Sequence, residues 1–478
     1  MKVTYLPSQI DSTSSTTALP YTTSPLGLVW YDVKLGFSLI LAMPLIVWPL
    51  KPWDSGPLDE LYPSKENLSD LFMHALLMIF QTIFLLSIPC CVALPLAVFL
   101  LYILAALVIN ATLCKILNGS KTYFESSVEL EDVSRHADEK WIFLNGVAAG
   151  HNWLQSALDR LSLAFGRKIV GVHNPTTGIM FDVLQCLIQR DFSYCTQDVR
   201  DGYVILKEAI NDPAFKKIVL VLHSQGGIEG GLMLDWLFDD VSAEVLQKVE
   251  VYTFGNAASH FNNPIRSYNT CRTNLLARAQ KSETAGKVSE ERVIRHIEHY
   301  ANSEEFVSRW GILNFTRSNV QNDNRFVGRL FVRKGSGHLF NQHYLDNMFS
   351  VDPDTKRVKD SNAFMDTLVD VDDDLAIRRE SASMETISNR YERGPAPSKP
   401  SNGHLNGPAN GTTAYDTVNG VDETERTPLQ SIVDGAESVL SPGACLAATK
   451  EISSRARQKP VKELSRLWLY RNGMSPSD

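Results

Sequence analysis

Ser224 is the residue whose type and setting most clearly predict chemistry. It follows the apolar run 217–223 and precedes Gly226 and a helix-like pattern over 228–240. A strand, a sharp turn and a helix in this order can hold a serine hydroxyl above a sheet as a nucleophile. The residue two positions earlier is usually small, whereas here it is Leu222, so we expect crowding at the turn. The alternative interpretation is a polar loop after a strand.

The segments around Ser224 predict the scaffold that would position it. Strands and helices alternate in the sequence. The predicted strands are 140–146, 168–173, 217–223 and 249–254, and the predicted helices are 152–165, 179–190, 197–211 and 228–240. Such alternation favours right-handed crossovers and an α/β fold with a doubly wound, mainly parallel sheet. In these sheets, sites form beyond the carboxyl ends of the strands.

Residues 130–350, less than half of the chain, resemble the α/β-hydrolases of the serine esterase and lipase type. The resemblance rests on Leu222-His-Ser-Gln-Gly226, on Tyr252-Thr-Phe-Gly255 and on Asn302-Ser-Glu-Glu-Phe-Val307. Among these enzymes the chain looks most like membrane-attached fungal hydrolase-like proteins. The resemblance implies an α/β-hydrolase fold in which the serine, an acid and a histidine follow one another along the chain.

The resemblance also places the acid and the base. The acid should follow the next long strand, predicted at 292–300. Lipases that this chain resembles carry an acid, one residue and then valine, which favours Glu305 and leaves Glu304 as the alternative acid. The family places its base on a loop after the last strand, predicted at 325–332, and this favours His338. The alternative base is His343, which falls in a helix-like segment where a histidine more often packs the helix.

An oxyanion intermediate needs two backbone N–H donors. The residue after the nucleophile, Gln225, should supply one. The resemblance implies that Val147, in the loop after the first strand, supplies the other. No pair of cysteines or histidines has metal-ligand spacing, and no phosphate-binding or dinucleotide motif occurs, so we expect neither a metal nor a cofactor. A net charge of −8 without a basic stripe argues against nucleic acid.

A long uncharged stretch predicts membrane attachment. No Asp, Glu, Lys or Arg occurs from residue 71 to 114, and a single span needs only about 20 apolar residues. The stretch 71–113 therefore predicts two membrane helices, near 71–88 and 92–113, either as two spans or as a hairpin that dips in from one side. A third candidate, the short segment 35–50, contains two prolines.

The bilayer is accordingly one predicted partner, and the sequence does not identify protein partners. Lysines flank both ends of the hydrophobic stretch, which favours a cytosolic catalytic domain on the endoplasmic reticulum or a lipid droplet. The regions outside it are predicted by composition. We expect an N-terminal tail over 1–34, a disordered tail over 355–460 and a short amphipathic helix over 461–471.

Together these patterns predict a membrane-anchored serine hydrolase that cleaves an ester, and a lipid acyl ester suits the anchoring. The chemistry would use a Ser-His-Glu triad and an acyl-enzyme intermediate. The alternative is a catalytically inactive relative of the fold that binds a lipid or a partner protein. A membrane scaffold whose tail recruits partners is a third interpretation.

Overall fold

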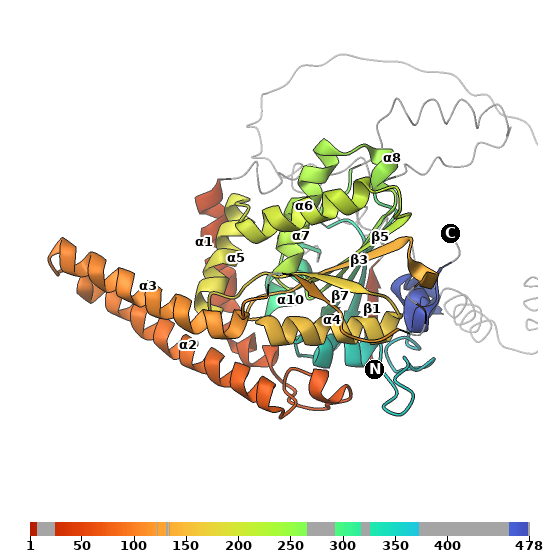
Figure 1. Ribbon diagram of the computed structural model, residues 1–478, viewed down its shortest axis with the longest axis horizontal. Helices are drawn as coiled ribbons and strands as arrows, with labels where there is room; N and C mark the ends of the chain where they lie inside the picture. The colour runs from red at the N-terminus through yellow and green to blue at the C-terminus, as the bar shows by residue number, and fades with distance from the viewer. Residues whose placement is uncertain are drawn as a thin grey trace, which may run out of the picture. The chain divides into compact units, whose positions relative to one another are not determined.

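The computed structural model describes residues 1–6, 24–121, 123–130, 132, 134–264, 292–316, 326–371 and 458–476. At its centre is an eight-stranded sheet with the order β1-β8-β7-β6-β5-β3-β4-β2 (Figure 1). The strands are β1 (Val3–Leu6), β2 (Phe124–Glu125), β3 (Glu139–Leu144), β4 (Ile169–Val172), β5 (Lys217–His223), β6 (Val249–Phe254), β7 (His296–Asn302) and β8 (Arg329–Arg333).

The six inner strands run parallel, which confirms the prediction of an α/β protein with a mainly parallel sheet. The two edge strands make the sheet mixed, because β1 pairs antiparallel with β8 and β2 pairs antiparallel with β4. The sequence did not predict these edges, since β1 and β2 are too short to show a hydrophobic period.

Both faces of the sheet are covered, as continuous apolar strands require. Alternate residues of β3 enter two separate cores: Ile142 and Leu144 join one, and Trp141 and Phe143 join the other. The first core is closed by α5 (Ile179–Phe192), α6 (Gln197–Asn211), α7 (Gly226–Asp240), α8 (Ala243–Leu246), α10 (Phe306–Trp310) and α11 (Ile312–Thr316). The second is closed by α4 (His151–Phe165), the π-helix η5 (Phe340–Leu345), α12 (Asp346–Met348) and the C-terminal segment.

Two long apolar helices precede the sheet: α2 (Lys65–Cys91) and α3 (Leu96–Asn118), which pack against each other as a hairpin (Figure 1). By length and composition alone, both could cross a membrane. Helix α2 starts before the expected residue 71, because the Ser64 hydroxyl caps it by accepting a hydrogen bond from the Asn67 N–H.

The earlier candidate segment 35–50 contains parts of two elements. Helix α1 (Pro25–Ser38) and the short helix η2 (Ile40–Ile46) meet at a bend of 74°, and together they would count as a third candidate span. A 3-10 turn, η3 (Gly56–Leu58), lies between η2 and α2. Residues 1–34, expected as a tail, therefore contribute β1 and most of α1.

The C-terminal residues return to the sheet. The expected amphipathic helix 461–471 consists of α16 (Val461–Leu464) and the 3-10 helix η6 (Leu467–Gly473). Val461, Leu467, Trp468 and Tyr470 are buried in the second core. It docks on the domain because Glu298 of β7 accepts hydrogen bonds from the N–H groups of Arg466 and Leu467. Of the expected tail, residues 372–457 lie outside the described residues, while β9 (Leu368–Asp370) and β10 (Gln458–Pro460) pair with each other.

Candidate functional site

Ser224 occupies a strained turn between β5 and α7. Its φ is 56°, a value that a residue with a side chain rarely adopts. Three backbone hydrogen bonds hold this conformation. The Ser224 N–H donates to the Phe254 carbonyl at 3.0 Å, and the Ser224 carbonyl accepts from Gly227 at 3.0 Å and Ala257 at 3.2 Å. The surrounding sheet therefore fixes the hydroxyl at the carboxyl edge of β5.

Two glycines make room for this turn. A Cβ on Gly146 would lie 2.4 Å from the Ser224 Cβ, and a Cβ on Gly226 would lie 2.7 Å from the Leu144 carbonyl oxygen. The expected crowding by Leu222 is relieved elsewhere, on helix α7. A Cβ on Gly230 would lie 2.3 Å from a Leu222 methyl, so the glycine supplies the space that this leucine needs.

His338 and Glu305 lie beside Ser224, although the three residues come from distant parts of the chain. The His338 Nε2 is 2.8 Å from the Ser224 Oγ, and the His338 Nδ1 is 3.3 Å from the Glu305 Oε2. This second contact is within ion-pair distance but is not aligned as a hydrogen bond. All three residues are almost fully buried.

Glu305 is positioned by its own helix. Its carboxylate caps α10, where it accepts hydrogen bonds from the N–H groups of Val307 and Ser308, each at 2.6 Å, and the Tyr344 hydroxyl donates to it at 3.3 Å. Glu304, the alternative acid, is exposed to solvent. The structure thus brings Glu305 to the histidine and leaves Glu304 outside.

The other two histidines near the site have backbone partners. The His343 Nδ1 accepts from the Leu339 N–H at 3.0 Å, and its Nε2 donates to the Pro49 carbonyl at 2.8 Å. Burial lowers the pKa of His343 to about 4, which suits this neutral arrangement. The His223 Nε2 makes a 2.9 Å contact with the His338 carbonyl oxygen.

Gln225 and Val147, the expected oxyanion donors, flank Ser224 from the helix start and from the loop after β3. Among the described residues, neither backbone N–H has a hydrogen-bond partner. The Val147 loop is held in place by Asp182 of α5, which accepts from the Ala148 N–H at 3.0 Å and from the Thr177 N–H at 2.7 Å. Sequence reasoning missed Asp182, whose one visible signal is an acid in the first turn of a helix.

Gln225 is also fixed through its side chain. Its Nε2 donates to the Gln189 Oε1 at 2.9 Å, and the Gln189 Nε2 donates to the Glu229 Oε1 at 3.3 Å. Glu229 is fully buried beside Asp198, and burial raises its pKa well above the usual range. This network joins the start of α7 to α5, and no sequence pattern indicated it.

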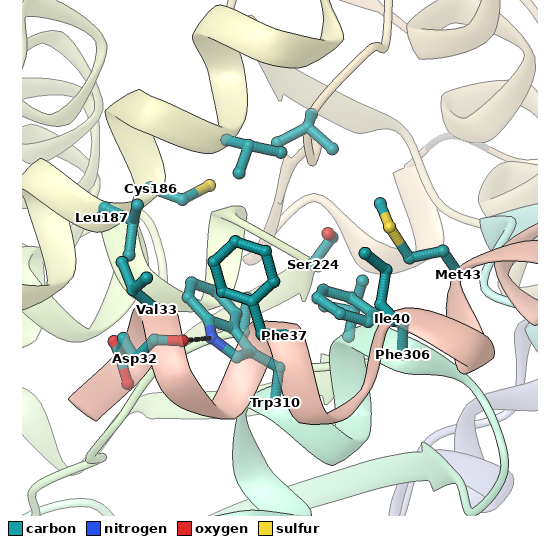
Figure 2. A pocket seen from close by; sticks show the side chains of 15 residues that line it. Asp32, Val33, Phe37, Ile40, Met43, Cys186, Leu187, Ser224, Phe306 and Trp310 are labelled. Carbon is teal, nitrogen blue, oxygen red and sulfur yellow. Dashed lines mark hydrogen bonds between the residues drawn. The ribbon is translucent and has the colours of Figure 1, made fainter. Parts of the chain in front are cut away.

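A cavity of about 270 Å³ opens at the Ser224 hydroxyl. Its walls are almost entirely apolar. They come from α1 and η2 (Asp32, Val33, Gly36, Phe37, Ile40, Met43), from α5 (Val183, Cys186, Leu187), from α10 (Phe306, Val307, Trp310) and from Val147 and Ala257. Figure 2 shows the serine hydroxyl facing the space between Phe37 and Ile40 on one side and Cys186 and Leu187 on the other. The N-terminal segment therefore forms one wall of the pocket.

Within the described residues, no three His, Cys, Asp or Glu side chains gather as metal ligands. Comparisons with protein-family models, with curated proteins and with solved structures found no match to this chain. The site must therefore be interpreted from its own geometry.

Proposed function

We propose that this chain is a membrane-attached serine hydrolase of the α/β-hydrolase type that cleaves an ester. The observation that carries the proposal is the contact of 2.8 Å between the Ser224 Oγ and the His338 Nε2, with the Glu305 carboxylate on the far side of the imidazole. A serine in a strained strand-to-helix turn, a base and an acid are the parts that acyl transfer needs.

The geometry supports a two-step reaction. His338 takes the proton of Ser224 as the oxygen attacks the ester carbonyl carbon, and the developing oxyanion faces the N–H groups of Gln225 and Val147. The C–O bond to the alcohol then breaks, and the alcohol leaves with the proton from the imidazolium. Water, deprotonated by His338, attacks the acyl-enzyme and releases the acid and the serine. Glu305 orients the ring and stabilises its charged form.

The apolar pocket supports an ester with a hydrocarbon acyl chain. Apart from Ser224 and Asp32, every residue that lines it is apolar or glycine, so the pocket offers little to a polar acyl group. Together with the apolar hairpin, this favours a lipid acyl ester. A cytosolic catalytic domain on the endoplasmic reticulum or a lipid droplet stays a prediction.

One observation favours the second candidate, a non-catalytic lipid-binding protein: the poorly aligned contact of the His338 Nδ1 with Glu305. Such contacts are often loose before substrate binds and tighten in the reacting complex. We therefore keep catalysis as the primary proposal.

Labelling with a fluorophosphonate probe tests whether the chain is a serine hydrolase or a non-catalytic protein. The wild type should be labelled, whereas Ser224→Ala and His338→Ala should not. A matched control is Ser162→Ala, which removes a buried serine hydroxyl without a hydrogen-bond partner on α4. His343→Gln should keep the label. An unlabelled but folded wild type would favour the non-catalytic protein, and labelling that depends on His343 would reassign the base.

A further inference from the structure

Helix α5 has its polarity reversed. Its three charged residues, Asp182, Arg190 and Asp191, are all buried. The exposed large side chains are apolar, namely Met180, Val183, Leu184, Ile188 and Phe192. A helix on a water-facing surface shows the opposite pattern, with charges outside and apolar residues inside. The outer face of α5 is therefore suited to an apolar medium.

Helix α1 and the following η2 share this reversal. Asp32 is buried, while the exposed large side chains are Leu26, Trp30, Tyr31, Phe37, Ile40, Leu41 and Met43, of which Leu41 is 90% exposed. The one exposed charge on α1 is Lys34, whose Nζ lies 4.8 Å from the centre of the Trp30 ring. A tryptophan beside a lysine is a common pair at a membrane interface, where the lysine head can reach water.

The two reversed helices are fastened to each other from the inside. Arg190 of α5 makes an ion pair of 2.6 Å with Asp32 of α1, and its guanidinium stacks on the Trp310 ring at 3.7 Å. The charged side chains of the two helices thus have their partners on the inner side, and the apolar side chains face outward. Phe37 and Val183 are 70% and 44% exposed and also line the cavity, so the pocket mouth lies at the seam between the helices.

The hairpin joins the same surface. The Gln81 Oε1 of α2 accepts from the Met180 N–H of α5 at 3.1 Å, and Gln81 and Asn110 both donate to the Thr177 carbonyl, at 2.7 and 3.0 Å. Phe84 of α2 meets Phe181 of α5 with ring centres 6.2 Å apart. The start of α2 and the end of α3 are therefore docked on the domain.

The end of the hairpin, with the turn between α2 and α3, projects beyond this contact (Figure 1). Phe84 is the last buried residue of α2 and Ala106 the first of α3, which leaves 85–91 and 96–105 free of the domain. At about 1.5 Å per residue these segments reach about 10 and 15 Å. A bilayer core is about 30 Å thick. The free end is thus long enough for one leaflet and too short for two.

We propose that the outer faces of α1, η2 and α5 and the free end of the hairpin form one membrane face, which inserts into a single leaflet of a lipid bilayer, and that the ester substrate enters the pocket between α1 and α5 from that leaflet. The occupant of the membrane face is lipid, because the face is continuous with helices apolar enough to cross a membrane. The insertion stands on its own, whereas the substrate route rests on the proposed hydrolase function.

The depth of the hairpin can be tested with its own thiol. Cys90 is exposed near the end of α2. In sealed phosphatidylcholine vesicles carrying the full chain, a membrane-impermeant maleimide should not label Cys90 from outside or when trapped inside, and should label it after detergent is added. The Cys90→Ala variant identifies the signal. Labelling from either side of intact vesicles would overturn the one-leaflet insertion.

The contact of α1 with lipid can be tested by fluorescence. Brominated phosphatidylcholine should quench tryptophan emission, and Trp30→Phe should lose part of that quenching. Trp236→Phe, which removes an exposed tryptophan on α7, is the matched control and should leave it unchanged. Equal loss of quenching in both variants, or in neither, would remove α1 from the membrane face.

The substrate route can be tested by comparing two ester substrates, one in the membrane and one in solution. Leu184→Glu and Ile188→Glu change the outer face of α5 without touching the pocket lining. Each should lower turnover of a long-chain ester embedded in vesicles by about tenfold or more and spare a short soluble ester. Val204→Glu on α6, another exposed apolar position, is the control and should affect neither.

The outcomes separate the two proposals. No turnover of either ester by a folded wild type, and no fluorophosphonate label, would reject the hydrolase and leave the membrane face to the thiol and quenching tests. Normal turnover of both esters by the α5 variants would reject the substrate route alone. A detergent-solubilised dimer that Leu184→Glu dissociates would reassign the face to contact with a second copy.

Discussion

Two buried arginines attach the N-terminal part of the chain to the sheet domain, and each faces two aspartates. Arg160 of α4 lies 3.3 Å from Asp346, whose carboxyl group lies beside that of Asp59. Arg190 of α5 lies 2.6 Å from Asp32, whose carboxyl group lies beside that of Asp191. Two adjacent carboxyl groups can form a hydrogen bond when they share a proton. The same arrangement, a buried arginine beside two aspartates, therefore occurs twice.

The surroundings of the two clusters differ. At Arg160, the neighbouring chain is tied down at several further points: the Ser55 N–H donates to Asp59 at 2.9 Å, and Glu60 accepts from the N–H groups of Asn341 and Gln342. At Arg190, the attached element is α1, whose outer face is exposed and apolar. One cluster closes the core of the domain, and the other holds a pocket wall.

The largest effect should come from Arg160→Met. Removing one partner of a buried ion pair costs about 3–5 kcal/mol, because the remaining acids lose their cation. The free energy of unfolding, measured by urea denaturation in detergent, should fall by about this amount. A loss below about 1 kcal/mol would mean that the Arg160 cluster does not close the core.

Arg190→Met should have a smaller global effect and a stronger local one. Helix α1 can leave the domain without unfolding the sheet, so the cost is limited to this local opening. Hydrogen exchange should rise over residues 24–46 and stay unchanged over β5 and β6. Hydrogen exchange that rises equally across the sheet would show that both clusters stabilise the whole domain.

The sequence could predict more of the candidate site than of the two arginine clusters. Ser224 has a local signature, and Glu305 and His338 follow predicted strands, so the order of elements together with the resemblance to lipases was enough to single them out. Arg190 and Asp32 are separated by 158 positions, and only the folded chain shows that they meet. A charged residue in an apolar helix pattern does not reveal whether it points inward or outward.

Strands could be predicted from the sequence where the segment was long enough to show a pattern. All six parallel strands were predicted, five of them as apolar runs, whereas the edge strands β1 and β2 were not. The effect of Leu222 was also misjudged from the local motif, because its space comes from Gly230, one and a half turns into the next helix. The apolar segment 35–50 indicated a membrane, but nothing in it indicated that it also lines a pocket.

The two clusters also predict a pH dependence. Burial and the neighbouring Asp32 raise the pKa of Asp191 to about 8, against the opposing effect of Arg190, and burial and Asp346 raise the pKa of Asp59 to about 9. The usual pKa of an aspartate is about 3.9. Between these values each of the two acids binds more protons in the folded chain than in the unfolded one, so the contribution of each to stability should fall as pH rises.

The measurement is the free energy of unfolding from pH 7 to pH 9, above the range in which buried histidines such as His343, with its pKa lowered to about 4, change stability with pH. Each acid should contribute a slope of at most about 1.4 kcal/mol per pH unit, ending near pH 8 for Asp191 and near pH 9 for Asp59. Asp191→Asn and Asp59→Asn should each remove their own part of the slope. Asp239→Asn, at an exposed position of α7, should not change it. Asp191→Asn and Asp59→Asn curves with the same slope as the wild type would contradict the shared protons.

The smallest effect should come from a third pair of acids, Glu229 and Asp198, which lie beside each other but have no ion-pair partner in the part of the chain that the structure describes. Burial raises the pKa of Glu229 well above its usual range, which favours its neutral form. An amide can accept the hydrogen bond from Gln189 and donate one to Asp198, so Glu229→Gln should change stability by no more than about 1 kcal/mol.

The Glu229→Gln variant also tests how Arg160 and Arg190 stabilise the fold. A near-neutral result would show that a buried pair of acids is stable with a proton alone, so that Arg160 and Arg190 act by fastening chain segments rather than by neutralising charge. Glu229→Leu, which removes both hydrogen bonds, is the matched contrast and should cost more than the amide. If Glu229→Gln instead costs as much as Arg190→Met, the acid pairs carry charge, and the contrast between core and pocket wall would need another cause.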